Sequence, residues 1–325
     1  MTYNWLKSNT FHHSEFSDLG RLVEAKQKKK IKISLCLPTL NEERTIAKEI
    51  VIMKSELMNR FPLIDEIVVV DSGSTDRTRE AAEAYGARFY SAADILPDME
   101  HFRGKGENLW KGLYITQGDI IIYLDADIKN IHHRFAYGLL GPLLLTDHIK
   151  YVKAFYDRPI AVGKNKMRST GGGRVTELVI RPLFALFFPE LTQIIQPLSG
   201  EYASYRDILE KIPFPIGYGV ETSMILDIYT KWGLEVIGQT DLDRRVHRNQ
   251  STQALGRMAF VIIKTFINRK AKLGLIDLKK KMFDEMIQYN LVGNEYRPVS
   301  FKMEGLERPP MVEVPAYTEK FAREN

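Results

Sequence analysis

Short apolar runs, each ending in a polar cluster, recur along the first half of this chain and constrain its fold more than any other feature. They cover residues 31–37, 67–70 and 120–124, and segments with helical spacing of apolar residues lie between them. Strand, turn and helix thus alternate at intervals of roughly thirty residues, a pattern typical of a parallel sheet with helices on both faces. The sequence predicts an α/β protein with a mostly parallel sheet.

The third run ends in a pair of carboxylates, Asp125 and Asp127, on either side of Ala126. Side chains two positions apart on an extended chain point the same way, so these carboxylates repel each other unless a cation lies between them. A helix-capping aspartate is one explanation of the pattern. The other is a site for Mg²⁺ or Mn²⁺, hard cations that take oxygen ligands and share them with substrate phosphates.

The ends of three predicted strands bear on this choice. Polar clusters occupy residues 39–42, 71–75 and 125–127. Open α/β sheets bind ligands beyond the carboxyl ends of their strands. A structural explanation suffices for one capped turn, but three clusters at one edge predict a nucleotide-binding crevice.

Composition narrows the class of protein. The 325 residues carry a net charge of +5, which favours small anionic ligands and is too diffuse to indicate nucleic acid. The single cysteine, Cys36, lies in an apolar run and cannot form a disulfide within the chain, so we expect a cytoplasmic protein. No membrane association is expected, because the apolar segment Val179–Ile195 is interrupted by Pro182 and Pro189.

The pattern divides the chain into four parts. Residues 1–30 are expected to form an N-terminal appendage and basic linker, and residues 31–150 a nucleotide-binding half. Residues 151–254 are expected to form a less regular half. Its first part overlaps a basic, glycine-rich stretch at 150–174, which is typical of either an anion-binding loop or a solvated loop. Residues 255–325 are expected to hold two helices, at about 255–273 and 278–289, and a tail lying on the surface or on a partner subunit.

Six motifs, spread over nearly the whole chain, have counterparts in one group of proteins. They are Leu37–Glu43, Asp71–Asp76, Gly104–Glu107, Asp125–Asp127, Gly172–Leu178 and Arg245–Asn249. Together they resemble the retaining nucleotide-sugar transferases of the GT-A fold, and more narrowly the glucosyl-3-phosphoglycerate synthase family. The resemblance implies a Rossmann-like, mostly parallel sheet flanked by helices, with a mixed α/β acceptor-binding half and C-terminal helices.

The resemblance also implies roles for individual residues. The nucleotide sugar would be bound by Pro38, Thr39, Leu40, Asn41, Glu42, Ser72, Lys105, Asp125, Ala126, Asp127, Tyr218, Glu221 and Arg245. The expected catalytic residues among them are Asp125, Asp127, Lys105 and Glu221. The acceptor would be bound by Gly173, Arg174, Val175, Thr176 and Asn249, and the metal by Asp127 and His247.

Several of these residues also have a structural explanation. Asn41 can cap the following helix, Ser72 can be a turn hydroxyl, and Lys105 can be a solvated lysine. Glu221 begins a predicted helix, where a carboxylate pairs with the helix dipole. A lone histidine such as His247 is more often structural than a metal ligand.

The activity implied by the resemblance is transfer of glucose from a nucleoside diphosphate glucose, with UDP-glucose expected, to 3-phosphoglycerate, with retention of configuration. The divalent cation would be Mg²⁺ or Mn²⁺, and Co²⁺ is possible because nitrogen ligands suit it. The alternatives are a mannosyl-3-phosphoglycerate synthase and a non-catalytic nucleotide-sugar-binding protein. The apolar residues at 255–273 cover too broad a face for one narrow stripe. Packing within one subunit could account for them, but with the resemblance we expect a homodimer.

Overall fold

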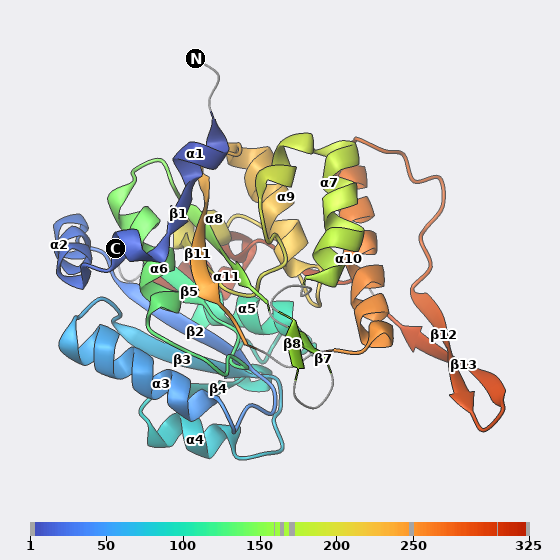
Figure 1. Ribbon diagram of the computed structural model, residues 1–325, viewed down its shortest axis with the longest axis horizontal. Helices are drawn as coiled ribbons and strands as arrows, with labels where there is room; N and C mark the ends of the chain where they lie inside the picture. The colour runs from blue at the N-terminus through green and yellow to red at the C-terminus, as the bar shows by residue number, and fades with distance from the viewer. Residues whose placement is uncertain are drawn as a thin grey trace.

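The structure is a computed structural model, and a twisted sheet of eight strands runs through its middle (Figure 1). The structure describes residues 4–158, 160–162, 166–168, 173–246, 250–303 and 305–322. For residues 160–162, 166–168 and 322 it describes the backbone alone. The spatial order is β1-β11-β6-β9-β5-β2-β3-β4. These strands are β1 (Thr10–His12), β2 (Ile33–Thr39), β3 (Glu66–Asp71), β4 (Arg88–Ser91), β5 (Ile120–Tyr123), β6 (Tyr151–Asp157), β9 (Tyr202–Tyr205) and β11 (Ile237–Arg244). All neighbours are parallel except β9, which is antiparallel to β5 and β6, so the predicted fold class is confirmed.

Helices cover both faces of the sheet. They are α1 (Trp5–Asn9), α2 (Leu19–Lys29), α3 (Ile46–Lys54), α4 (Thr78–Ala84), α5 (Lys105–Ile115), α6 (Arg134–Leu145), α7 (Arg181–Phe187), α8 (Arg206–Leu209), α9 (Val220–Trp232), α10 (Thr252–Lys272) and α11 (Pro315–Ala322). Short helical segments are η1 (His13–Phe16), η2 (Ser55–Arg60), η3 (Ala92–Asp94), η4 (Thr176–Ile180), η5 (Pro189–Gln193) and η6 (Met311–Glu313). In the parts of the chain described, no helix combines the length and apolarity needed to cross a bilayer.

The two faces of the sheet bury separate cores because successive side chains of a strand point to opposite faces. In β5, Ile120 and Ile122 pack with α2, α3 and α6. Ile121 and Tyr123 pack with α5, α9, α10 and α11 on the other face. A strand that is apolar at every position is therefore required at this place, which explains the uninterrupted run seen in the sequence.

The N-terminal residues differ from the expected appendage. The strand β1 pairs in parallel with β11, with Thr10 opposite Gln239, and so forms an edge of the main sheet. Trp5 is buried, and its indole nitrogen donates a hydrogen bond to the Leu234 oxygen at 2.8 Å. A strand of three residues has too short a pattern to be recognised in a sequence, and its pairing partner lies over two hundred residues away.

The C-terminal residues also depart from expectation. The helix predicted at 255–273 is α10, but the helix predicted at 278–289 is wrong. Its residues lead into β12 (Glu285–Val292), which forms a projecting hairpin with β13 (Glu295–Lys302) (Figure 1). Gly293 has φ +62° in the turn, and a Gly-Asn pair between two extended runs is a hairpin signal that outweighs a short helical pattern.

The tail beyond this hairpin packs onto the same subunit. The pair β10 (Phe214–Pro215) and β14 (Glu307–Arg308) is antiparallel, and Met311, Val314 and Tyr317 are buried in the core.

A second small pair, β7 (Ile160–Val162) and β8 (Lys166–Arg168), lies within the basic stretch. The strands of the two predicted halves share one sheet, because β9 lies between β6 and β5.

Candidate active site

The strand ends border a cavity of about 540 Å³, within the usual size of small-molecule sites, roughly 300–1,000 Å³. Most of the residues predicted to bind donor or acceptor line it: Pro38, Thr39, Leu40, Glu42, Ser72, Lys105, Asp125, Ala126, Asp127, Gly173, Arg174, Val175, Thr176, Tyr218, Glu221 and Arg245. Asn41 is not among the lining residues. His247 and Asn249 lie outside the described residues.

Two neighbouring strand ends are tied together by polar contacts. Thr39 is opposite Asp71 in the sheet register, and its hydroxyl donates to that carboxylate at 2.9 Å. Asn41, with φ +59°, accepts a hydrogen bond from the Thr75 backbone N–H at 2.9 Å. The following helix α3 is preceded by Thr45, so Asn41 is not its cap. Instead, Asn41 connects the loops after β2 and β3.

Ser72 is more than a turn hydroxyl. Its hydroxyl donates to the Asn108 side-chain oxygen at 2.8 Å, and the Asn108 amide donates to the Val70 backbone oxygen at 2.9 Å. Asn108 thereby joins α5 to the end of β3. The sequence analysis did not single out Asn108, which lies in an otherwise ordinary helical segment and is identifiable only from its buried contacts.

Lys105 lies between two glycines because α5 begins in close contact with another backbone. A Cβ atom on Gly106 would lie only 1.8 Å from the Pro215 oxygen, and Gly104 has φ +154°. This packing fixes the start of α5. The Lys105 ammonium lies 2.6 Å from Asp125 Oδ1 and 2.8 Å from Glu221 Oε1, so it is not a solvated lysine.

Arg245 is the second cation of the site. It follows β11 directly, since this strand runs to Arg244. One guanidinium nitrogen, Nη2, lies 2.7 Å from Asp127 and 3.1 Å from Asp125, and Nε lies 2.9 Å from Glu201. Only 4% of the Arg245 side chain is exposed, so the guanidinium offsets the repulsion between the two aspartates in a largely dry setting.

The charges of this ion cluster do not balance. Two cations, Lys105 and Arg245, are paired with four carboxylates: Asp125, Asp127, Glu201 and Glu221. The formal charge of the cluster is therefore −2. Burial raises the pKa of Glu201, so a further positive charge nearby would also keep that carboxylate ionised. The side chain of Asp127 is 36% exposed and lines the cavity, which makes it the accessible oxygen ligand. This donor set fits a hard divalent cation.

The same contacts set the protonation states. Burial alone would lower the pKa of Lys105, but Asp125 and Glu221 raise it well above its ordinary value. Burial alone would raise the pKa of Asp125, but Lys105 and Arg245 lower it well below its ordinary value. At neutral pH the lysine is therefore charged and the aspartate ionised. Burial, followed by the nearby charge of Asp127, raises the pKa of Glu42 to about 7.

The predicted acceptor residues lie at the start of a helix. Gly173 has φ +81°, and the residues after it lead into η4 and then α7. Val175 and Thr176 are buried, and Arg174 donates to the Gln250 backbone oxygen at 3.0 Å. This places a guanidinium at the cavity in contact with the residues that precede α10.

Three further features of the site were missed by sequence reasoning. Arg103 and Arg158 line the cavity, and Arg158 was counted only as one charge of the basic stretch. Glu201 becomes a site residue because β9 enters the sheet between β5 and β6, which no local pattern reveals. Gly200 leaves room for Asp125, since a Cβ atom there would lie 2.0 Å from its Oδ2 atom.

Lys153 also departs from the expected solvated or anion-binding role. It lies in β6, is 1% exposed, and its Nζ has no hydrogen-bond partner among the described residues. The ammonium lies 4.5 Å from the centre of the Tyr202 ring. Burial lowers its pKa to about 7, against the opposing effect of Glu221.

Comparison with known proteins places this geometry in a family. Residues 34–168 match the model for glycosyl transferase family 2. Over 324 residues the chain is 54% identical to the glucosyl-3-phosphoglycerate synthase of Petrotoga mobilis, covering 100% of this chain and 99% of that one. The chain belongs to the glucosyl-3-phosphoglycerate synthase family. The predicted family and enzyme class, a glycosyltransferase, are thereby confirmed.

Solved structures of this family agree with the fold. The glucosyl-3-phosphoglycerate synthase of Mycobacterium tuberculosis, in complex with Mn²⁺, UDP and glucosyl-3-phosphoglycerate, is similar with a TM-score of 0.82 and 39% identity, over 94% of this chain and 99% of that chain. Mannosyl-3-phosphoglycerate synthase from Rubrobacter xylanophilus is similar with a TM-score of 0.88 and 33% identity, over 95% and 98%. Backbone similarity thus does not separate the two sugars, whereas the 54% identity lies with the glucosyl enzymes.

Proposed function

We propose that this protein transfers the glucosyl unit of UDP-glucose to 3-phosphoglycerate, with retention of configuration and with a divalent cation. The observation that carries the proposal is the ion cluster of Asp125, Asp127, Glu201, Glu221, Lys105 and Arg245, which lacks two positive charges and opens onto the cavity. Relatives crystallised with Mn²⁺ or Mg²⁺ together with UDP support this choice of donor and metal.

The donor side of the cavity, which we define as residues 38–42, 72, 105 and 125–127, would bind the nucleotide. Asp127 would hold the metal together with His247, and the metal would neutralise the departing diphosphate as a Lewis acid. Lys105 stays charged at neutral pH, so it can stabilise the same negative charge from within the protein. Glu42, with a pKa of about 7, can either donate to or accept from a ribose hydroxyl.

The route of the reaction follows from how the carboxylates are bound. A covalent route needs a carboxylate free to attack the anomeric carbon. Asp125 and Glu221 both pair with Lys105, which lowers the nucleophilicity of each. We therefore favour attack of the acceptor hydroxyl on the same face as the leaving group, with the leaving phosphate taking the proton. Glu221 would then orient hydroxyls of the transferred sugar.

The acceptor side, which we define as residues 173–176, would bind 3-phosphoglycerate. This molecule carries a phosphate and a carboxylate, and a guanidinium binds such oxyanions through two parallel hydrogen bonds. Arg174 lines the cavity at the start of a helical segment, and Arg158 lines the same cavity. Asn249 stays a predicted acceptor ligand outside the described residues.

A second candidate function is mannosyl transfer, the activity in the name of the Rubrobacter xylanophilus enzyme to which this chain is similar with a TM-score of 0.88. A product assay with UDP-glucose, GDP-glucose and GDP-mannose, each with 3-phosphoglycerate, separates the two. We expect the UDP-glucose reaction to be fastest. Product formed only from GDP-mannose would overturn the glucosyl assignment, and donor binding without turnover would indicate a non-catalytic protein.

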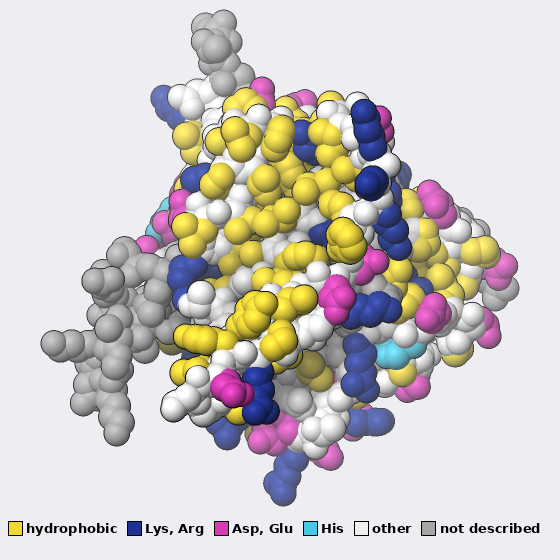
Figure 2. Space-filling view, turned by 90° about the vertical axis from the view of Figure 1, so that its right-hand side faces the viewer, with side chains coloured by type: hydrophobic (Ala, Val, Ile, Leu, Met, Phe, Trp, Pro, Cys, Tyr) yellow, Lys and Arg dark blue, Asp and Glu magenta, His cyan; other side chains and the backbone are white. Residues whose placement is uncertain are grey.

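Assembly and location are also proposals. We propose a homodimer, because hydrophobic side chains gather on the face that carries α7 and α10 (Figure 2). Leu186 on α7 and Leu178 on η4, which leads into α7, are 72% and 76% exposed. A cytoplasmic location agrees with the single buried cysteine, Cys36.

A further inference from the structure

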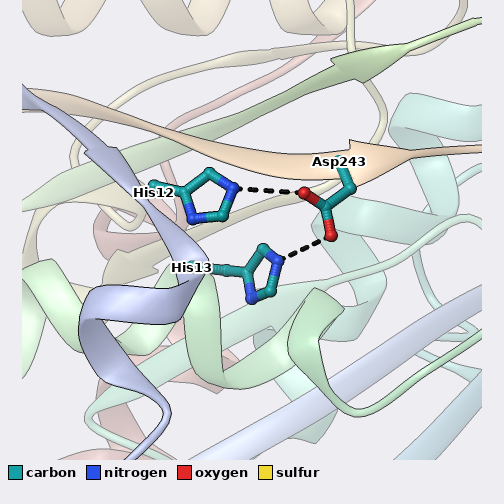
Figure 3. Close-up of side chains that lie close together, drawn as sticks. All are labelled: His12, His13 and Asp243. Carbon is teal, nitrogen blue, oxygen red and sulfur yellow. Dashed lines mark hydrogen bonds and ion pairs between the residues drawn. The ribbon is translucent and has the colours of Figure 1, made fainter.

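A second group of metal-ligating side chains lies at the edge of the sheet formed by β1 and β11, separate from the cavity lining. His12 and His13 come from the junction of β1 and η1, and Asp243 comes from β11 (Figure 3). Their ligand atoms all lie within 4.8 Å of one another, which holds for no other group of three such residues in the part of the chain that the structure describes.

Both imidazole rings turn the same nitrogen towards the carboxylate. His12 Nε2 lies 3.1 Å from Asp243 Oδ1, and His13 Nε2 lies 2.7 Å from Oδ2 (Figure 3). Ligand atoms that share one zinc ion at about 2.0–2.1 Å in tetrahedral geometry are about 3.3 Å apart. The two present contacts are slightly shorter than this spacing, and all the ligand atoms lie within 4.8 Å of one another, so they are close to the spacing that a shared ion requires.

The other nitrogen of each ring already has a partner that can fix the required tautomer. His13 Nδ1 lies 3.0 Å from the Tyr137 hydroxyl, and His12 Nδ1 lies 2.6 Å from the Ser14 hydroxyl. The Ser14 backbone N–H donates a hydrogen bond to His12 Nδ1 at 3.3 Å, which favours the tautomer with the proton on Nε2. Zinc binding would therefore move the His12 proton to Nδ1, which then donates to the Ser14 hydroxyl. When Nδ1 donates to the hydroxyl, the Nε2 lone pair faces Asp243, as in metal sites whose histidines are oriented by an outer hydrogen bond.

The backbone presents Asp243 to the two histidines in an unusual conformation. Asp243 has φ +65°, and the pairing of β11 with β6 shifts register between Asp241 and Arg244. Such a bulge re-aims a side chain at the edge of a sheet. Arg134 is a nearby positive charge that would repel a bound cation. Its Nε lies 3.7 Å from Asp243 Oδ2 and donates a hydrogen bond to the Leu242 oxygen at 2.9 Å.

We propose that His12, His13 and Asp243 bind a zinc ion that fastens the N-terminal segment to β11. Two imidazoles and one carboxylate form a donor set that suits Zn²⁺ and leaves one position for water. Asp243 lies two residues before Arg245, so the ion would also hold the strand that delivers this arginine to the ion cluster. The site is distinct from the proposed catalytic metal at Asp127 and His247.

The test uses the full chain, stripped with a chelator and carrying Asp127→Ala and His247→Ala so that the proposed catalytic metal is removed. Zinc chloride alone is titrated against a chromophoric competitor, without nucleotide or acceptor. We expect one zinc ion per chain and a higher melting temperature with zinc. His12→Gln and Asp243→Asn should each weaken binding about tenfold or more. Asn tolerates positive φ, and His12 is partly exposed, so both variants should fold.

Three variants sharpen the result. Tyr137→Phe should weaken zinc binding about tenfold, because loss of an outer partner of a metal ligand typically costs about 10–100-fold. Arg134→Gln should strengthen it, because a repelling charge is removed. His132→Gln, in the neighbouring stacked pair with His133, is the matched control and should have little effect. Absence of bound zinc in the Asp127→Ala, His247→Ala background would overturn the proposal, as would unchanged binding in Asp243→Asn.

Discussion

On the donor side of the cavity Lys105 contacts two carboxylates, and Arg245, which holds both aspartates, contacts three. On the acceptor side Arg174 donates to a backbone oxygen, that of Gln250. Charge on the donor side is thus fixed by buried ion pairs that pre-exist the ligand, whereas charge on the acceptor side is available to an incoming anion. The difference suggests that replacing Lys105 or Arg245 reduces both turnover and stability, whereas replacing Arg174 reduces mainly affinity.

The largest expected effect comes from removing the proposed metal ligands. Asp127→Ala and His247→Ala should each nearly abolish turnover while leaving the melting temperature close to that of the wild type, because Asp127 is partly exposed in a loop. A chelator should inactivate the wild type, and Mn²⁺ or Co²⁺ should restore activity at least as well as Mg²⁺, since nitrogen ligands suit them better. Full activity in the chelator would contradict the metal assignment.

Arg245→Gln should destabilise the fold as well as the reaction. It leaves Glu201 and the two aspartates without their shared cation, and breaking a buried ion pair on one side costs about 3–5 kcal/mol. Urea unfolding of the variant, with exposed Arg21→Gln as control, measures this loss. A variant as stable as the control would show that the donor side is not held by its ion pairs.

Lys153, which is buried in β6, predicts a pH dependence of stability. Its folded-state pKa is about 7, below the ordinary value of 10.5, so folding releases its proton between these values and stability rises with pH. Below pH 7 both states bind the proton and this gain is lost. Relative to Lys153→Met, the wild type should gain roughly 2–3 kcal/mol from pH 7 to pH 9. If stability changed with pH in parallel for the two proteins, the Lys153 ammonium would be hydrated and its pKa would not be lowered.

Arg174→Ala should weaken acceptor binding without affecting the donor. A charge-assisted hydrogen bond contributes on the order of 1.5–3 kcal/mol, so the apparent affinity for 3-phosphoglycerate should fall roughly ten- to a hundredfold. Arg174→Lys should recover only part, because an ammonium cannot make the forked contact. Titration of donor and acceptor, with Arg297→Ala on the exposed hairpin as control, measures both. Loss of donor binding alone would show that the segment around Arg174 binds the nucleotide.

The smallest effect is expected at the apolar face next to the acceptor side. Leu186 lies on α7, which continues from η4 and the acceptor residues. Leu186→Glu should halve the mass measured by light scattering at micromolar concentration and raise the KM for the acceptor modestly, with little change for the donor. Leu275→Glu, also at an exposed leucine, is the control. A monomeric mass for the wild type would remove the dimer proposal.

Much of the nucleotide-binding half could be predicted because its signals are local. The apolar runs at 31–37, 67–70 and 120–124 correspond to β2, β3 and β5. The motifs around Asp125 and Arg174 led to residues that line one cavity. The hairpin at 285–302 was missed although its Gly-Asn turn was visible, because the apolar residues before it also fit a helical spacing.

By itself, the sequence determined the fold class, the family and the edge of the sheet at which the candidate site lies. These features depend on strand periodicity and on strand-end motifs, which are formed by residues close together in the sequence. Only the tertiary structure decided which charges meet. Lys105 pairs with Glu221, Arg245 holds Glu201 with the two aspartates, and His12 and His13 meet Asp243. These partners are separated by dozens to hundreds of residues. Glu201 and the two histidines reach their partners because β9 and β1 take places in the sheet that no local pattern specifies.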